Sequence, residues 1–219
     1  DQICDMNDEK YRELMSIYNK SFTNESKRLK LLFNNEMNDG KDEDYASMYS
    51  NLIIEGKSEG EARTRATIYA QQRKLGKEKE YAEGYALLIF NKFNRIEADK
   101  ISEIYREQRN RGKGTDYAFE YACLTYNKMD AKSADKVATI YERQCKLGKK
   151  FHYADQYAML VVYGVSKEEA DKRSEIYQEQ HNKGKSVHYA FKYSELVYRG
   201  MDEKEADKMA KIYEQQRLM

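Results

Sequence analysis

The 219-residue chain contains no proline, no tryptophan, only three cysteines and no long apolar run. At an ordinary usage of about 5%, roughly 11 prolines would be expected, so every turn is built with other residues. Three cysteines are too few for a disulfide framework. No segment approaches the roughly 20 apolar residues that a membrane span needs. These absences exclude the collagen-like, disulfide-stapled and membrane-spanning classes.

An excess of one charge is missing as well. Lys and Arg number 39, Asp and Glu number 38, and the net charge is +1, with a mean hydropathy of −1.00. Because nucleic-acid-binding proteins usually carry a basic excess or stripe, we expect no nucleic-acid partner. The few cysteines favour a reducing compartment such as the cytoplasm, and secretion remains an alternative because a helical array needs no disulfides.

The sequence repeats every 36 residues without insertion or deletion. A Tyr-Ala pair opens each unit, and a second tyrosine, a leucine, an alanine, Ile-Tyr, a glutamine and Gly-Lys follow at fixed positions. The opening tyrosines are Tyr45, Tyr81, Tyr117, Tyr153 and Tyr189. We therefore expect one repeat domain over 1–219, with a divergent N-terminal capping repeat at 1–40 and five regular repeats at 41–219.

Each unit predicts a pair of helices. In the third regular unit, apolar positions four and three residues apart predict a first helix over 117–127 and a second over 131–147. Good N-cap residues precede the second helix in every unit, namely Ser58, Asn94, Asp130, Ser166 and Asp202. Four of them are followed three residues later by glutamate, which predicts a capping box: Glu61, Glu97, Glu169 and Glu205.

The glycine of Gly-Lys predicts the end of the second helix, since glycine readily adopts the left-handed conformation there. Short loops make the two helices antiparallel, and identical units must stack in the same way. The expected fold is all-α: an αα-solenoid of six tandem 36-residue helix-turn-helix repeats. Most of the 20 tyrosines fall in repeating columns, which predicts core packing, with a tyrosine ladder along a binding groove as the alternative.

A tandem helical pair of this period resembles the Sel1-like and tetratricopeptide repeats. The stretch from Leu196 to Ala206 reads LVYRGMDEKEA, which is similar to the Leu, Tyr, Gly, Asp and Ala run of a Sel1-like repeat. The resemblance is one of class and covers the whole chain. It implies a binding scaffold, usually for peptides or proteins. The Glu-Ala to Gly-Lys half also resembles a pentatricopeptide helix, which would imply single-stranded RNA, but the neutral charge argues against that partner.

Columns that differ between repeats are free to carry specificity. In related solenoids the first helix of each repeat lines the binding side, so we expect the partner to contact variable positions there. The favoured anchors are aromatic, because aromatic residues dominate interaction hot spots: Phe119, Tyr126, Phe191 and Tyr198. The other candidates are Glu83, Leu87, Phe90, Asp155, Met159 and Glu195. Ordinary packing between repeats is the alternative explanation of all ten.

Reactive residues are sparse in this sequence. Cys145 occupies a column of Arg and His, so we expect it to be exposed, with no nucleophile arrangement around it. His152 and His188 are expected to cap or precede a first helix, and His181 could meet His188 across the Gly184 turn. Two ligands do not make a zinc site. We expect no catalysis, no cofactor and no bound metal.

These observations favour a non-catalytic scaffold that binds a protein or peptide. One alternative is a carrier that holds a lipid or small apolar ligand in the solenoid groove. Another is a secreted effector-type interaction module. The last second helix keeps the core-type residues Ile212, Tyr213 and Gln216 without a polar cap. This pattern predicts either that the array continues in a longer protein or that this repeat self-associates with another copy of the chain.

Overall fold

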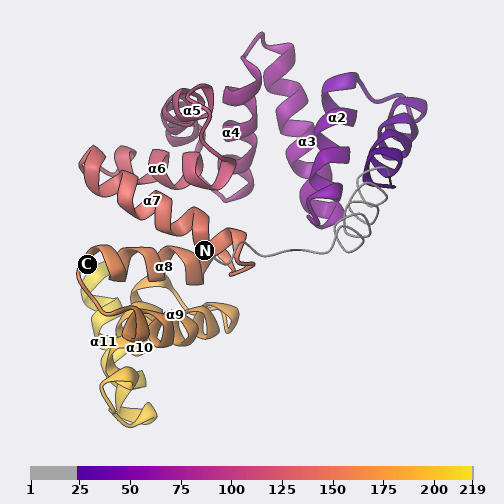
Figure 1. Cartoon of the computed structure of the whole chain (residues 1–219). Coiled ribbons are helices and arrows are strands. Elements are labelled where there is room, and N and C mark those ends of the chain that lie inside the picture. Colours follow the sequence, from indigo (N-terminus) through magenta and orange to yellow (C-terminus); the bar gives the residue numbers. More distant parts are fainter. Residues whose placement is uncertain (1–23, 219) are drawn as a thin grey trace, which may run out of the picture. The chain divides into compact units, whose positions relative to one another are not determined.

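A computed structural model of the chain describes residues 24–218, which form helices joined by short turns, with no strand in that range (Figure 1). Residues 1–23 of the expected capping repeat, with Cys4, and Met219 lie outside the described residues. The chain divides after Ser102, within one helix, into two compact units. Unit 1 contains the described residues up to Ser102 and unit 2 those from Glu103, and each is described by itself.

The helices alternate between 12 and 16 residues, as the repeat predicts. The first helices are α2 (Glu43–Ile54), α4 (Lys79–Phe90), α6 (Thr115–Tyr126), α8 (Phe151–Val162) and α10 (Val187–Tyr198). The second helices are α3 (Glu59–Lys74), α5 (Arg95–Asn110), α7 (Ala131–Lys146), α9 (Lys167–Asn182) and α11 (Glu203–Leu218). In each set, consecutive helices begin 36 residues apart. A further helical segment, 24–38, precedes α2.

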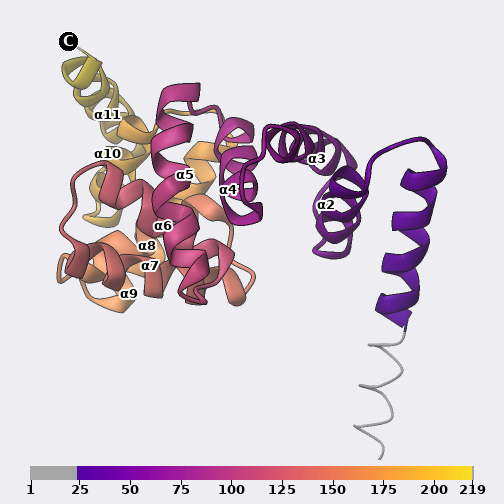
Figure 2. The same cartoon turned by 90° about the horizontal axis from the view of Figure 1, so that it is seen from above.

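Helices that are consecutive in the chain pack against one another within each unit. In unit 1, α2 packs on α3 and α3 on α4, and the segment 24–38 lies beside α2 (Figure 2). In unit 2, the same holds for each pair from α6 to α11, and α8, α9 and α10 lie side by side in Figure 1. Packing between consecutive helices is typical of a helical repeat solenoid. The predicted all-α repeat fold is confirmed.

The predicted helix ends are close to the observed ones. The second helix of the third regular repeat, expected over 131–147, is Ala131–Lys146. The first helix begins at Thr115, two residues before the expected start, because the extended Gly114 (φ −64°, ψ 162°) is its N-cap. For the same reason His152 lies inside the first turn of α8 and does not cap it.

The predicted capping boxes take three forms. At Asp202 the side chain accepts from the Lys204 N–H (3.0 Å), so the box predicted with Glu205 is not formed. At Asn94 both hydrogen bonds are present: the Glu97 N–H donates to Asn94 Oδ1 (3.0 Å), and the Asn94 N–H donates to Glu97 Oε2 (3.2 Å). At Ser166 the side chain accepts from the Glu169 N–H (3.2 Å), but the Glu169 carboxylate pairs with Arg173 at 3.1 Å. An arginine four residues on has drawn the glutamate away from the cap.

The glycine of the Gly-Lys column ends the second helix as predicted. Gly76 has a φ of +80°, and the N–H groups of Gly76 and Lys77 donate to the carbonyls of Arg73 (2.9 Å) and Gln72 (3.1 Å). This pair of bonds is the Schellman arrangement, which satisfies the last carbonyls of the helix. Gly40, Gly112, Gly148 and Gly184 have the same positive φ.

Alanine columns let each first helix approach the preceding second helix. In unit 1, Tyr69 of α3 packs against Ala82 and Ala86 of α4. In unit 2, Val137 and Tyr141 of α7 pack against Ala154 and Ala158 of α8. Within each unit, these contacts join one repeat to the next.

The opening tyrosines make polar and ring contacts with neighbouring side chains. The Tyr117 hydroxyl donates to Asp135 of the partner helix at 2.6 Å, and the Lys113 ammonium lies 4.4 Å from the centre of the Tyr117 ring. The same ring–ammonium contact recurs at the other four opening tyrosines. All five opening tyrosines are buried. The core interpretation of this column is confirmed, and its rings are not available for a ligand ladder.

Candidate functional site

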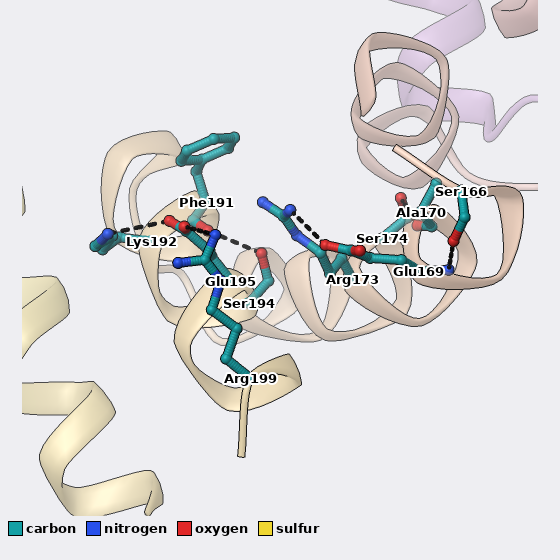
Figure 3. A network of polar contacts seen from close by, with 10 residues as sticks. All are labelled: Ser166, Glu169, Ala170, Arg173, Ser174, Phe191, Lys192, Ser194, Glu195 and Arg199. Atoms are coloured by element: carbon teal, nitrogen blue, oxygen red, sulfur yellow. Dashed lines mark hydrogen bonds and ion pairs between the residues drawn. The ribbon is translucent and has the colours of Figure 1, made fainter. Parts of the chain in front are cut away.

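The predicted binding residues occupy one stripe of the first helices, at positions four and then three residues apart. On α10 the stripe consists of Phe191, Glu195 and Tyr198. It borders the second helix of the preceding repeat, because the Arg173 guanidinium of α9 lies 5.8 Å from the centre of the Phe191 ring (Figure 3). The variable stripe therefore runs along the seam between consecutive repeats. Packing across that seam decides which of its members reach the surface.

Phe119 does not lie on an open binding face. It is only 5% exposed, and its ring meets that of Phe151 edge-on, with centroids 6.1 Å apart. Phe151 in turn packs edge-on against Tyr141 of the unit 2 core. The prediction of Phe119 as a surface anchor is wrong, since burial against neighbouring aromatic rings satisfies its apolar surface.

Asp155 and Met159 of α8 are also drawn into the seam. Met159 packs against the core cluster of Val137, Tyr141, Ala154 and Ala158. The Asp155 carboxyl group is hydrogen-bonded to Glu120 of α6, and burial raises its pKa to about 6. Burial, with the nearby Asp155 charge, also raises the pKa of Glu120 well above its usual value. These two α8 residues therefore contact other repeats and not an open face.

Four other candidates are half-buried. In unit 1, these are Glu83, Leu87 and Phe90 of α4; in unit 2, Tyr126 at the end of α6. Val162, at the same repeat position as Tyr126, lines a shallow groove of about 410 Å³ with Ile140 of α7. Their partial burial agrees with the seam position of the stripe.

The most exposed part of the stripe is the α9–α10 seam. Phe191 and Tyr198 are each 36% exposed. Between them, the Glu195 carboxylate pairs with the Lys192 ammonium at 3.0 Å and with the Arg199 guanidinium at 2.9 Å (Figure 3). The structure thus brings two aromatic rings and a small ion-pair network together on one helix.

The charges at this seam are fixed by their neighbours. Burial raises the pKa of Glu195, but the hydrogen bond from Lys192 and the charges of Lys192, Arg199 and Arg173 outweigh it, and the net pKa is lowered. Glu195 is therefore ionised at neutral pH. The buried Arg173 is held by Glu169 and by the face of Phe191, since a guanidinium is attracted to an aromatic ring.

Arg173 was not identified from the sequence, although its side chain packs against Phe191 at this seam. Its repeat position holds the apolar Ile101 and Val137 in two other repeats. The column is apolar in its other members except Arg65, and a charged residue in such a column was the available signal that it contacts a variable partner. The matching Arg65 of α3 is also buried and also pairs with a glutamate four residues earlier, Glu61, at 2.9 Å.

The histidines are arranged differently from the prediction. His181 of α9 stacks on His152 of α8, with ring centroids 3.9 Å apart and an interplanar angle of 4°, so its partner is His152 and not His188. The corresponding positions in the first regular repeat are Asp44 and Arg73, which form an ion pair at 3.2 Å. The 29-residue spacing shared by the two pairs could have identified the contact.

Cys145 is half-buried and packs against the unit 2 core, so the expectation of an exposed thiol is wrong. In the described part of the chain, no three His, Cys, Asp or Glu side chains come close enough to hold a metal ion. None of the helices within residues 24–218 is long and apolar enough to cross a membrane.

No protein-family model, no curated protein and no solved structure matches this chain. The resemblance to Sel1-like and tetratricopeptide repeats therefore stays a prediction from the residue pattern. The chemistry of the α9–α10 seam has to be interpreted from its own geometry.

Proposed function

We propose that the protein is a non-catalytic scaffold that recognises a protein or peptide through the surface of α10. We define the α10 patch as Phe191, Glu195, Tyr198 and Arg199. The observation that carries the proposal is the exposure of two aromatic rings, 36% each, on a helix whose opening residues Tyr189 and Ala190 are buried. Exposed aromatic rings next to arginine are typical of the centres of interaction surfaces.

The patch favours a partner with an apolar anchor beside polar groups. The rings of Phe191 and Tyr198 provide the apolar area. Glu195 and Arg199 lie between and beside them as a charged pair, with the Arg199 side chain 66% exposed. Such a charged rim selects partners by orientation and charge more than it adds affinity.

The test is a pull-down from a native extract with three baits: the wild-type chain, Phe191→Asp/Tyr198→Asp, and Tyr163→Asp as the matched control. Tyr163 is an exposed tyrosine at the C-cap of α8, in the preceding repeat, and is not one of the patch residues. Phe119 is left unchanged because it is buried. All three baits should show the same helical circular dichroism.

A protein captured by the wild type and by Tyr163→Asp, and lost with the double variant, would support the proposal. Titration with that purified protein should then show at least about tenfold weaker binding by the double variant. Equal recovery of every captured protein by all three baits would contradict it.

We further propose that two copies of the chain associate through α11. Met209 and Ile212 are 44% and 49% exposed, whereas Ile101 and Val137, at the repeat position of Met209, are buried. Val137 is buried because the following helix packs on it. An apolar face of this kind favours a two-fold dimer in which the same surface contributes from both copies.

A further inference from the structure

Unit 1 contains an open cavity that the α10 patch does not use. It has a volume of about 240 Å³ and lies between the helical segment 24–38 and α2. Leu29 and Phe33 provide its apolar lining, and Ser47, Ser50 and Asn51 its polar lining, with Lys30 as the charged group. The cavity is therefore an apolar pocket with hydrogen-bonding groups from both helices.

The repeat explains why there is space at this place. The same positions, four repeats further on, form the filled α9–α10 seam of Figure 3: Leu29 corresponds to Arg173 and Ser47 to Phe191. There the Phe191 ring lies against the Arg173 guanidinium. A leucine and a serine are both smaller, so the volume that a phenyl ring fills in one seam is left open in the other.

Every other first helix carries a larger side chain than serine at this position, namely Glu83, Phe119, Asp155 and Phe191. The cavity therefore forms where Ser47, the smallest residue of this column, faces Leu29. A larger side chain substituted for Ser47 would enter this space, which an aromatic ring occupies at the same position of α10.

We infer that this cavity binds a phenolic ring, in the place that the Phe191 ring takes in the α9–α10 seam. An apolar cavity of about 150 Å³ is large enough for benzene, so the volume admits a ring with a polar substituent. The phenol oxygen has partners in the lining, since Lys30 is a donor there. The Asn51 amide nitrogen donates to the Ser47 carbonyl at 2.9 Å, which leaves the side-chain oxygen of Asn51 to accept a hydrogen bond from the phenol.

Two sources can supply this chemistry: a free phenol, or the tyrosine side chain of a peptide. The probes are therefore 4-methylphenol and the blocked peptide Gly-Gly-Tyr-Gly-Gly, each titrated into the full ¹⁵N-labelled chain. Amide shifts in NMR spectra report the position and the saturation of binding. The inference concerns unit 1 and is independent of the α10 patch in unit 2.

Three variants sharpen the test. Ser47→Phe fills the cavity with the residue found at this position in α6 and α10. Asn51→Leu does the same with the residue that α4 has at its corresponding position, Leu87, and serves if Ser47→Phe loses its helical circular dichroism. Ser47→Ala is the matched control, because alanine keeps the volume open.

Saturable shifts confined to 24–38 and α2 are expected for at least one probe, with about tenfold or greater weakening in Ser47→Phe and little change in Ser47→Ala. Stronger binding of 4-methylphenol would identify a free phenol as the source, and stronger binding of the peptide a tyrosine side chain. No saturable shift with either probe would overturn the inference. Binding that is unchanged in both filled variants would overturn it as well.

Discussion

Phe119 and Phe191 occupy the same repeat position and have opposite environments. Phe119 packs against Phe151 in the core of unit 2, whereas Phe191 lies over Arg173 and keeps a third of its surface exposed. The difference comes from the neighbours, since the repeats place Phe151 beside one ring and a charged side chain beneath the other.

Truncation of the two rings should therefore cost different amounts of stability. Phe119→Ala should lower the free energy of unfolding by about 3–5 kcal/mol, as for other buried phenylalanines. Phe191→Ala should lower it by about 1 kcal/mol. Urea unfolding followed by circular dichroism measures both values, and equal losses would show that the two environments do not differ as described.

Lys92 and Lys128 hold a backbone conformation that suits glycine. Their φ values are +70° and +66°, at the repeat position where Gly56, Gly164 and Gly200 have +81° to +88°. A side chain in this left-handed region costs energy through the contact between Cβ and the following carbonyl.

Replacing such a lysine by glycine should stabilise the turn. We expect Lys128→Gly to raise the free energy of unfolding by about 0.5–1 kcal/mol, because relief of the backbone contact exceeds the extra freedom that glycine has in the unfolded chain. Gly164→Ala, at the same position one repeat later, should have the opposite sign. A stabilising Gly164→Ala in thermal unfolding would argue against the positive φ.

Pairs of helices are joined by side chains that differ from repeat to repeat. Asp44 and Arg73 connect α2 to α3 by an ion pair, and His152 and His181 connect α8 to α9 by stacking. Burial lowers the pKa of both histidines, and the His152 charge lowers that of His181 further. Two imidazolium rings in this stack would repel each other, so the joint favours the neutral forms.

The contribution of the His152–His181 stack to stability should decrease at acidic pH. The pKa values of both histidines are lower in the folded chain than their usual value of about 6.5, so the unfolded chain binds more protons below neutrality. The contribution of the two histidines to the free energy of unfolding is complete above about pH 6.5. It is lost as the pH falls through their pKa values in the folded chain. His152→Asp/His181→Arg, which copies the Asp44–Arg73 pair, should remove this loss. Urea unfolding of wild type and variant at pH 7.5 and pH 5 gives the comparison. Parallel pH profiles would disprove the role of the stack.

Two first helices, α6 and α8, are joined by the carboxyl pair Glu120 and Asp155. Burial raises the pKa of Asp155 from 3.8 to about 6, so the folded chain binds more protons than the unfolded chain between these values. Stability therefore falls as the pH rises through this window, the opposite sign to that of the histidine stack.

Removal of one carboxyl group of the Glu120–Asp155 pair should prevent this decrease in stability at neutral pH. Glu120→Gln keeps a hydrogen-bonding side chain and should raise the free energy of unfolding by about 1–2 kcal/mol at pH 7.5. At pH 4, where both carboxyl groups of the wild type are largely protonated, the gain should be close to zero. Urea midpoints at the two pH values measure the difference, and a destabilised variant at pH 7.5 would contradict the buried-charge account.

At the scale of the whole molecule, one pattern of 36 residues sets all ten helices from α2 to α11. The pattern buries the apolar face of a second helix under the next first helix, as Val137 and Tyr141 are buried under Ala154 and Ala158. The described residues leave the same face of α11 open at Met209 and Ile212. This face carries the proposed self-association.

Light scattering coupled to size exclusion should detect a dimer that forms with rising concentration. We expect a Kd of about 10–100 μM, because the exposed apolar area is small. Met209→Asp/Ile212→Asp should give a monomer at every concentration, and Lys208→Asp, an exposed substitution on the same helix, should dimerise like the wild type. A wild-type mass that stays monomeric up to millimolar concentration would exclude self-association through α11.

The residue pattern was enough to predict the helices, their ends and their order. Ser166 is an N-cap and Gly76 a helix end because capping and left-handed turns depend on residues only a few positions apart. Each of these local patterns occurs in five repeats, which strengthens the prediction. The same reasoning placed the opening tyrosines in the core, since their column never varies.

The exposure of the variable residues depends on contacts between helices, which the residue pattern does not contain. Whether Phe119 is buried, whether His181 meets His152, and whether Ser47 leaves a cavity depend on side chains that belong to other helices. Their pairing follows from how neighbouring repeats pack, because the volume of one side chain at a seam is felt only through the residue that lies opposite. For this reason, of the ten residues predicted from the sequence, the proposed site keeps those around the exposed rings of α10.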